Sequence, residues 1–76
     1  MNEQRKSVRR KLQSMAPSVA IPYIKTFDLP EEDEVVVIRH NCRKESLQQI
    51  AISMNMSIET AKERHTAALS KIAGAM

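Results

Sequence analysis

The sequence predicts a small all-α domain of three or four helices. The chain has 76 residues, which is enough for one domain with a small core. It contains one glycine and five methionines, and Tyr23 and Phe27 are its only aromatic residues. This composition favours helices over a small β-barrel, because strands are enriched in aromatic residues. A chain of this size has little room for a deep catalytic cleft, so we expect a binding protein and no enzyme.

Cysteine and histidine usage predicts neither a disulfide nor a metal site. Cys42 is the only cysteine, so no internal disulfide can form. Cys42 beside Arg43 and Lys44 would suit a redox-sensing thiol of lowered pKa, but an ordinary loop thiol is the simpler interpretation. His40, Cys42 and His65 lack the spacing of metal ligands, so no metal and no cofactor are expected.

The charges are segregated along the chain. Residues 1–25 carry a net charge of +5, residues 28–34 carry −5 and residues 39–71 carry +3. This separation indicates a polyanionic partner better than the overall charge of +3 does. We therefore divide the chain into a basic N-terminal helix or arm with its linker, residues 1–27, and a C-terminal domain, residues 28–76. No apolar stretch approaches the roughly 18 residues of a membrane span, so we expect a cytoplasmic protein with no membrane partner.

A first helix is predicted over residues 2–15, with Arg5 and Arg9 one turn apart on its polar face. Its apolar face consists of Val8, Leu12 and Met15. Pro17 should end this helix, and Pro22 should prevent a new one. Residues 18–26 are then either an irregular strap or a partly disordered arm. In the strap, the buried side chains would be Ile21, Tyr23 and Ile24.

The acidic block is predicted to open a helix over residues 30–41. Asp28 is a candidate cap, Pro30 suits the first turn, and the acidic side chains that follow favour the positive end of the helix dipole. The block is therefore interpreted as a solvated helix N-terminus. At least one residue of the apolar run 35–38 must face outward, as must Ile52. These spare apolar side chains suggest a partner surface for a second copy or RNA polymerase.

Two further helices with a tight turn between them have the spacing of a helix-turn-helix. Ser46 and Gln49 form a capping box at the start of the first of these helices. Its inward face should be Leu47, Ile50, Ala51 and Met54. Asn55 tolerates the left-handed conformation that the turn requires, Met56 can fill the core, and Ser57 caps the last helix, which Gly74 should end. Its outward side chains would be Glu59, Thr60, Lys62, Glu63, Thr66 and Arg64.

Residues 29–72 resemble the fourth conserved region of bacterial sigma factors, the domain that reads the promoter −35 element. The matching segments are Leu29-Pro30-Glu31, Ser46-Leu47-Gln48-Gln49-Ile50-Ala51, Met56-Ser57-Ile58-Glu59-Thr60-Ala61-Lys62-Glu63-Arg64 and Ala68-Leu69-Ser70-Lys71-Ile72. The sequence departs from this family at Ile58, where a polar or basic residue is usual, and in a longer link over residues 41–45. It also lacks the family's promoter-melting region. The resemblance therefore implies a fragment or a small stand-alone regulator of the kind that phages and mobile elements carry.

The resemblance implies a set of DNA contacts. Ile58, Glu59, Lys62 and Glu63 would enter the major groove, where Glu59 can accept from cytosine and Lys62 can donate to guanine or a phosphate. Ser57 and Thr60 would contact the backbone. The groove-facing segment is expected to cover residues 57–66, including Thr66. Further phosphate contacts would come from Arg43, Lys44 and Arg64, and the basic N-terminal arm is either a further phosphate contact, a solvated tail or a protein-docking helix.

The sequence therefore predicts a transcription regulator that binds duplex DNA as a monomer or homodimer, near the nucleoid of a bacterial or phage-infected cell. Two alternatives stay open. One is a protein-interaction module that docks on RNA polymerase or an anti-sigma-type protein, which acidic Glu59 and Glu63 favour because they repel phosphate. The other is a DNA-packaging component, such as the small subunit of a phage terminase.

Overall fold

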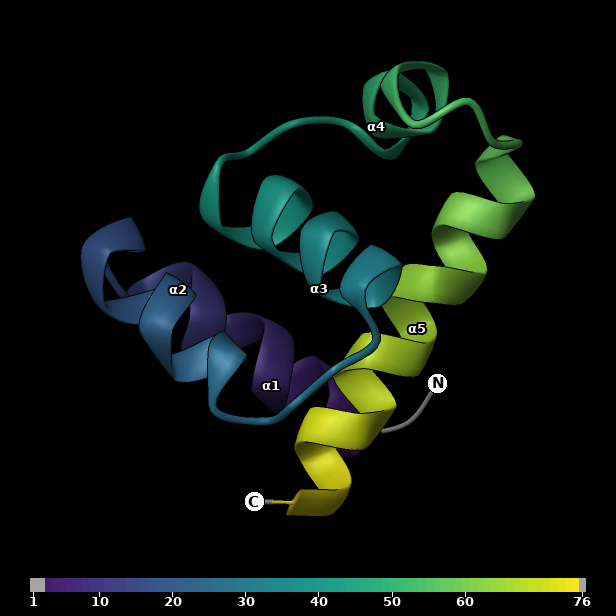
Figure 1. The fold of residues 1–76 in the computed structure, drawn as a ribbon. Helices are drawn as coiled ribbons and strands as arrows, with labels where there is room; N and C mark the ends of the chain where they lie inside the picture. Colours follow the sequence, from purple (N-terminus) through teal and green to yellow (C-terminus); the bar gives the residue numbers. More distant parts are fainter. Residues whose placement is uncertain (1–2, 76) are drawn as a thin grey trace.

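The computed structural model describes residues 3–75, which form five α-helices and one π-helical turn (Figure 1). The helices are α1 (Glu3–Ser14), α2 (Pro17–Lys25), α3 (Glu31–Val37), α4 (Leu47–Ser53) and α5 (Ile58–Ala75), and the π-helical turn η1 (Ile38–Cys42) continues α3. No strand occurs among residues 3–75, and the prediction of an all-α fold is confirmed. The expected number of three or four helices is too low, because α2 adds a fifth.

The long helix α5 crosses the molecule, and α1, α3 and α4 pack against it (Figure 1). Its inward face buries Ala61, His65, Ala68, Leu69 and Ile72. One apolar cluster joins Leu69 and Ile72 to Val8 of α1 and to Ile24 of α2. The N-terminal segment therefore contributes to the same core as α5, and burial of this shared apolar surface holds the helices together.

Helix α1 follows its prediction closely. Val8 and Leu12 are buried, and Met15, just beyond the helix, is partly buried against the core. Asn2, at which the predicted helix begins, lies outside the described residues.

The segment after α1 is a helix, so the predicted strap is wrong. Pro17 does not block α2 because it occupies the first position, where a helix needs no backbone donor. Pro22 lies inside α2 with its side chain exposed, while Ala20 and Ile24 lie one turn apart and are fully buried. A proline in a helix interior costs about 3 kcal/mol, and burying an isoleucine returns about 1.5–3 kcal/mol. Tertiary burial therefore offsets most of the local penalty.

Helix α3 forms where it was predicted but begins and ends differently. Asp28 is not its cap; Asp28 has a φ of 57°, and the N-cap position belongs to Pro30. At the other end, Arg43 N donates to Ile38 O over 3.1 Å, which closes a wide π-helical turn. This turn buries Asn41 and Cys42. Within the apolar run, Val35 alone is only partly buried.

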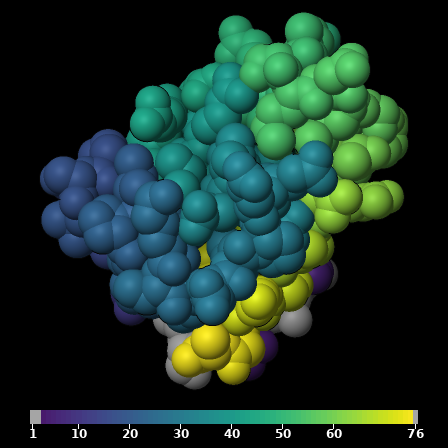
Figure 2. Space-filling view, in the orientation of Figure 1, coloured from purple at the N-terminus to yellow at the C-terminus, as the bar shows by residue number. Residues whose placement is uncertain are grey.

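The acidic block is only partly solvated. Glu31 and Glu32 are exposed as expected, but Asp33 is buried with 5% of its surface exposed. The expectation of a fully solvated block is therefore wrong at Asp33, because an arginine of α5 lies next to it. In Figure 2, α3 lies in the middle of the face shown, between α2 and the end formed by α4 and the start of α5.

Helix α5 runs past the residue expected to end it. Gly74 lies within the helix, which continues to Ala75, and Gly74 does not have a positive φ. The open space around Gly74 means that a glycine is not needed there for packing.

Candidate nucleic-acid interface

The start of α4 has one half of the predicted capping box, and the reciprocal bond between the Gln49 side chain and Ser46 does not form among the described residues. Ser46 Oγ accepts a hydrogen bond from Gln49 N over 3.1 Å, which satisfies one of the free backbone donors of the first turn. Ile50 and Ala51 are buried against the interior, and Ile52 on the opposite side is 73% exposed, as predicted. The small side chain of Ala51 allows α4 to lie close to α5, with which it is in contact.

The turn between α4 and α5 is held by backbone geometry and by one side-chain cap. Asn55 has a φ of 56°, the left-handed conformation expected for it. Met56 N then donates to Ala51 O over 2.9 Å. Ser57 Oγ accepts a hydrogen bond from Thr60 N over 3.1 Å and donates one to Thr60 Oγ1 over 2.9 Å. These bonds fix where α5 begins and in which direction it leaves the turn.

The first turns of α5 present a polar face to solvent. Glu59, Lys62, Glu63 and Thr66 are all exposed, and none of them pairs with another residue of the described chain. Ile58 and Thr60 are partly buried, and Thr60 is hydrogen-bonded to Ser57. The helix thus offers unpaired polar side chains at its N-terminal end while its other face is fixed in the core.

Arg64 does not belong to this outward face. Its Nη2 lies 3.4 Å from Glu32 Oε1, and its Nη1 lies 3.6 Å from Asp33 Oδ1. The guanidinium therefore neutralises the start of α3 and ties that helix to α5. The sequence correctly placed Arg64 in the last helix but could not show that a buried carboxylate lies beside it.

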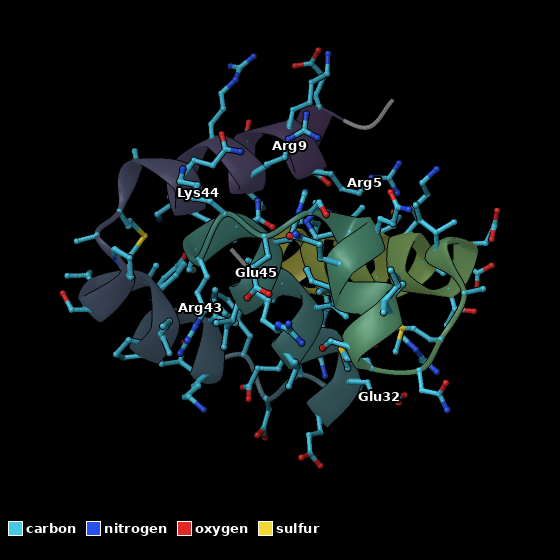
Figure 3. All side chains as sticks on the ribbon, turned by 90° about the horizontal axis from the view of Figure 1, so that it is seen from above. Arg5, Arg9, Glu32, Arg43, Lys44 and Glu45 are labelled. Carbon is cyan, nitrogen blue, oxygen red and sulfur yellow. The ribbon has the colours of Figure 1, made fainter. Side chains whose placement is uncertain are left out.

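Arg43 and Lys44 also lie apart from the proposed groove-facing residues. Both are exposed and follow η1, where Lys44 has a φ of 62°. Figure 3 shows them on the side of the molecule away from the first turns of α5. The structure gathers most of the residues predicted to bind DNA at the start of α5: Ser57, Ile58, Glu59, Thr60, Lys62, Glu63 and Thr66. It leaves Arg43 and Lys44 elsewhere.

A groove on the protein surface lies between α2 and α3, and Arg43 is one of the residues that line it. It has a volume of about 520 Å³. Its apolar residues are Ile21, Val35 and Ile38, and its charged residues are Lys25, Glu34, Arg39, Arg43 and Glu45. Two ion pairs neutralise four of these charges: Lys25 with Glu34 at 3.5 Å and Arg39 with Glu45 at 2.6 Å. The Arg39 guanidinium lowers the pKa of the Glu45 carboxyl through this hydrogen-bonded pair. The sequence indicated a spare apolar residue in this region but not a groove.

A buried polar cluster lies behind the outward face of α5. His65 Nε2 bonds to Asn41 Oδ1, and the rings of His65 and His40 meet edge to face with centroids 4.8 Å apart. His40 Nδ1 donates to the Glu45 carbonyl oxygen over 2.8 Å. Cys42, in the same π-helical turn as Asn41, is buried in the apolar core, and burial raises the pKa of its thiol despite the nearby charges of Lys44 and Arg43. The alternative of a lowered thiol pKa is therefore wrong.

Residues 3–75 contain no group of three or more His, Cys, Asp or Glu side chains placed to hold a metal ion. Over the same residues, none of the helices has the length and apolar character needed to cross a membrane.

Comparison with known proteins leaves the site to be interpreted from its own geometry. No family model, no curated protein and no solved structure matches the chain.

Proposed function

We propose that the chain is a non-enzymatic transcription regulator that binds duplex DNA. In this proposal α4, the turn at Asn55 and α5 act as a helix-turn-helix of the sigma-factor type, and the first turns of α5 enter the major groove. The observation that carries the proposal is that a turn of fixed geometry leads directly into the end of α5 whose polar side chains are unpaired. The capped start of α5 follows a left-handed residue, and the exposed side chains of that end have no partner within the described chain.

The polar face contains side chains suited to base edges. Lys62 can donate to guanine or to a phosphate, and Glu59 can accept from the amino group of cytosine. The free N–H groups at the start of α5, next to Ser57, suit a phosphate oxygen. Glu59 and Glu63 repel phosphates, so their presence favours discrimination between sequences over tight binding to any duplex.

The direct test is fluorescence anisotropy with a labelled random-sequence duplex at several salt concentrations. We expect salt-sensitive binding, since each phosphate contact contributes about −0.9 to the log–log slope. Lys62→Gln should weaken binding, whereas Lys25→Gln, which removes the same charge from α2, should not. The proposal is wrong if the wild-type chain fails to bind even at low salt.

A second variant tests whether α5 reads bases. Glu59→Gln removes a negative charge from the proposed groove face, so we expect tighter binding to random duplex and weaker preference for a sequence obtained by selection. An unchanged affinity for both duplexes would place Glu59 outside the interface.

The groove between α2 and α3 favours a second candidate function, docking on a protein such as RNA polymerase. Its apolar side chains Ile21, Val35 and Ile38 lie beside the uncompensated charge of Arg43. The two functions separate in one experiment. DNA binding that disappears by about 0.15 M salt, together with salt-resistant capture of purified RNA polymerase that Val35→Asp abolishes, would favour docking.

A further inference from the structure

Among residues 3–75, no acidic side chain forms an ion pair with a cation of α1. The ion pairs among residues 3–75 engage Lys25, Arg39 and Arg64, and none involves a side chain of α1. Helix α1 carries five cations, Arg5, Lys6, Arg9, Arg10 and Lys11, and one acidic residue, Glu3. Lys11 alone turns to an aromatic ring, with its Nζ 5.0 Å from the centre of Tyr23. The rest of α1 therefore leaves a strongly positive surface.

This positive surface lies along α5. Arg5 Nη1 donates to Ser70 Oγ over 3.4 Å, and one turn further along α1 the charge of Arg9 is near enough to His65 to help lower its pKa. The residue numbers rise on α1 while they fall on α5, so the two helices run antiparallel. In Figure 3, Arg5 and Arg9 lie on one side of the molecule and Glu32 lies on the opposite side.

The side of α5 that Arg5 reaches is continuous with the proposed groove-facing end. Lys62, Thr66 and Ser70 follow one another at intervals of four residues, so they form one stripe along the helix, and all three are exposed. With a rise of 1.5 Å per residue, Lys62 and Ser70 are about 12 Å apart along the axis, or three to four base pairs of duplex. A duplex held at Lys62 would therefore extend past Arg5.

The outward face of α5 also lacks enough positive charge of its own. Lys62 is accompanied there by Glu59 and Glu63, and Arg64 is occupied by Glu32 and Asp33. Phosphate contacts supply a large share of the affinity of a DNA-binding protein. The cations that make these contacts must therefore come from an element other than α5. Helix α1 is the adjacent element with unpaired arginines.

We propose that Arg5 and Arg9 of α1 bind the phosphate backbone of the same duplex whose major groove α5 enters. This inference rests on the proposed function and adds a second contact surface to it. Arginine suits the role because its planar guanidinium makes two parallel hydrogen bonds to a phosphate. Arg5 and Arg9 would position the duplex without reading its sequence, and Glu59 and Lys62 would supply the discrimination.

The test compares two double variants that lose the same charge. Arg5→Gln/Arg9→Gln removes two cations from the proposed surface, and Lys25→Gln/Arg43→Gln removes two from the groove between α2 and α3. We expect the first variant to lower the magnitude of the salt slope by roughly 1.8 and the affinity for any duplex at least tenfold. The second variant should leave both the slope and the affinity close to those of the wild type.

The outcomes separate this inference from the proposed function. If the wild type binds and the Arg5/Arg9 variant keeps its slope and affinity, α1 is not a contact surface, while the helix-turn-helix proposal stands. Equal losses in both double variants would also overturn the inference, because the effect would then be one of net charge. If the wild type binds no duplex at low salt, the proposed function fails and the inference fails with it. If the Arg5/Arg9 variant loses its helical circular-dichroism signal, Arg5→Gln alone should show about half the change in slope.

Discussion

His65 Nε2 donates a hydrogen bond to Asn41 Oδ1 over 2.5 Å and thereby joins α5 to the π-helical turn inside the molecule. Both side chains are buried. Burial is the main reason, with smaller contributions from the charges of His40 and Arg9, that the pKa of His65 is lowered to about 4. The ring is therefore neutral at neutral pH, and its single proton is held on the nitrogen that faces Asn41.

We expect the free energy of unfolding to fall as the pH drops from about 6.5 towards about 4. In this window the unfolded chain binds a proton at His65 and the folded protein does not, so acid favours unfolding. Below the folded pKa both states carry the proton, and the contribution of this residue becomes constant. Urea unfolding at about pH 7 and about pH 5 measures the change.

His65→Gln provides the control for this prediction, because a glutamine can still donate to Asn41 but does not titrate. The variant should lose less stability than the wild type between the two pH values. All other side chains are the same in both proteins, so only the difference between them reports on His65. An identical loss in both would contradict the lowered pKa.

The contacts of Arg64 predict that its pairing with Asp33 contributes more to the free energy of unfolding than its pairing with Glu32 does. Asp33 is buried, whereas the Glu32 side chain is 58% exposed. Arg64→Ala would leave the Asp33 carboxylate buried without a counter-charge and should cost about 1–3 kcal/mol. Glu32→Gln should change the free energy of unfolding by less than about 0.5 kcal/mol, since exposed ion pairs contribute little.

A rescue experiment assigns the Arg64 effect to the buried charge. Adding Asp33→Asn to Arg64→Ala removes the unpaired carboxylate, so the double variant should be more stable than Arg64→Ala alone in urea unfolding. If the second substitution lowers the stability further, the contact does not act through charge.

The features that the sequence predicted correctly are those that neighbouring residues determine. Ser46 caps the backbone of Gln49, Ser57 caps that of Thr60, and Asn55 takes up a left-handed conformation. Each of these depends on at most four consecutive residues and on the chemistry of one side chain. The α4–turn–α5 segment could therefore be placed within one or two residues.

The features that the sequence did not predict depend on contacts between distant segments. Helix α2 forms in spite of Pro22 because Ile24 is buried against the core. Asp33 and Arg64 lie far apart in the chain, and so do Arg5 and Ser70. Helical periodicity assigns such residues to a polar face but does not indicate which partner lies opposite. Without matching relatives, no signal in a single sequence could have paired them.

The buried position of Cys42 predicts a slow reaction with thiol reagents. Only 6% of its surface is exposed, and burial raises the pKa of its thiol, so little thiolate is available. Ellman's reagent should modify the folded protein much more slowly than the urea-unfolded chain. The matched control is Cys42→Ala/Ser18→Cys, which moves the thiol to an exposed position of α2 and should react quickly when folded. Equal rates in the two folded proteins would show that Cys42 is accessible.

The left-handed conformation of Asn55 predicts that two small substitutions there differ in their effect on the free energy of unfolding. With a φ of 56°, Asn55→Ala places a side chain without local hydrogen bonds in a conformation that costs about 1–2 kcal/mol. Asn55→Gly has no such penalty and should leave the free energy of unfolding nearly unchanged. Gln48→Ala, at an exposed position inside α4, controls for loss of a polar side chain and should have little effect.

Urea unfolding and DNA-binding anisotropy of Asn55→Ala, Asn55→Gly and Gln48→Ala test whether the left-handed conformation of Asn55 also serves the proposed function. If the turn sets the direction of α5, Asn55→Ala should also weaken DNA binding under conditions in which it is still folded, while Asn55→Gly should bind like the wild type. Equal stability of the alanine and glycine variants would mean that the positive φ is not required. A destabilised Asn55→Ala that binds DNA normally when folded would instead show that the turn serves the fold alone.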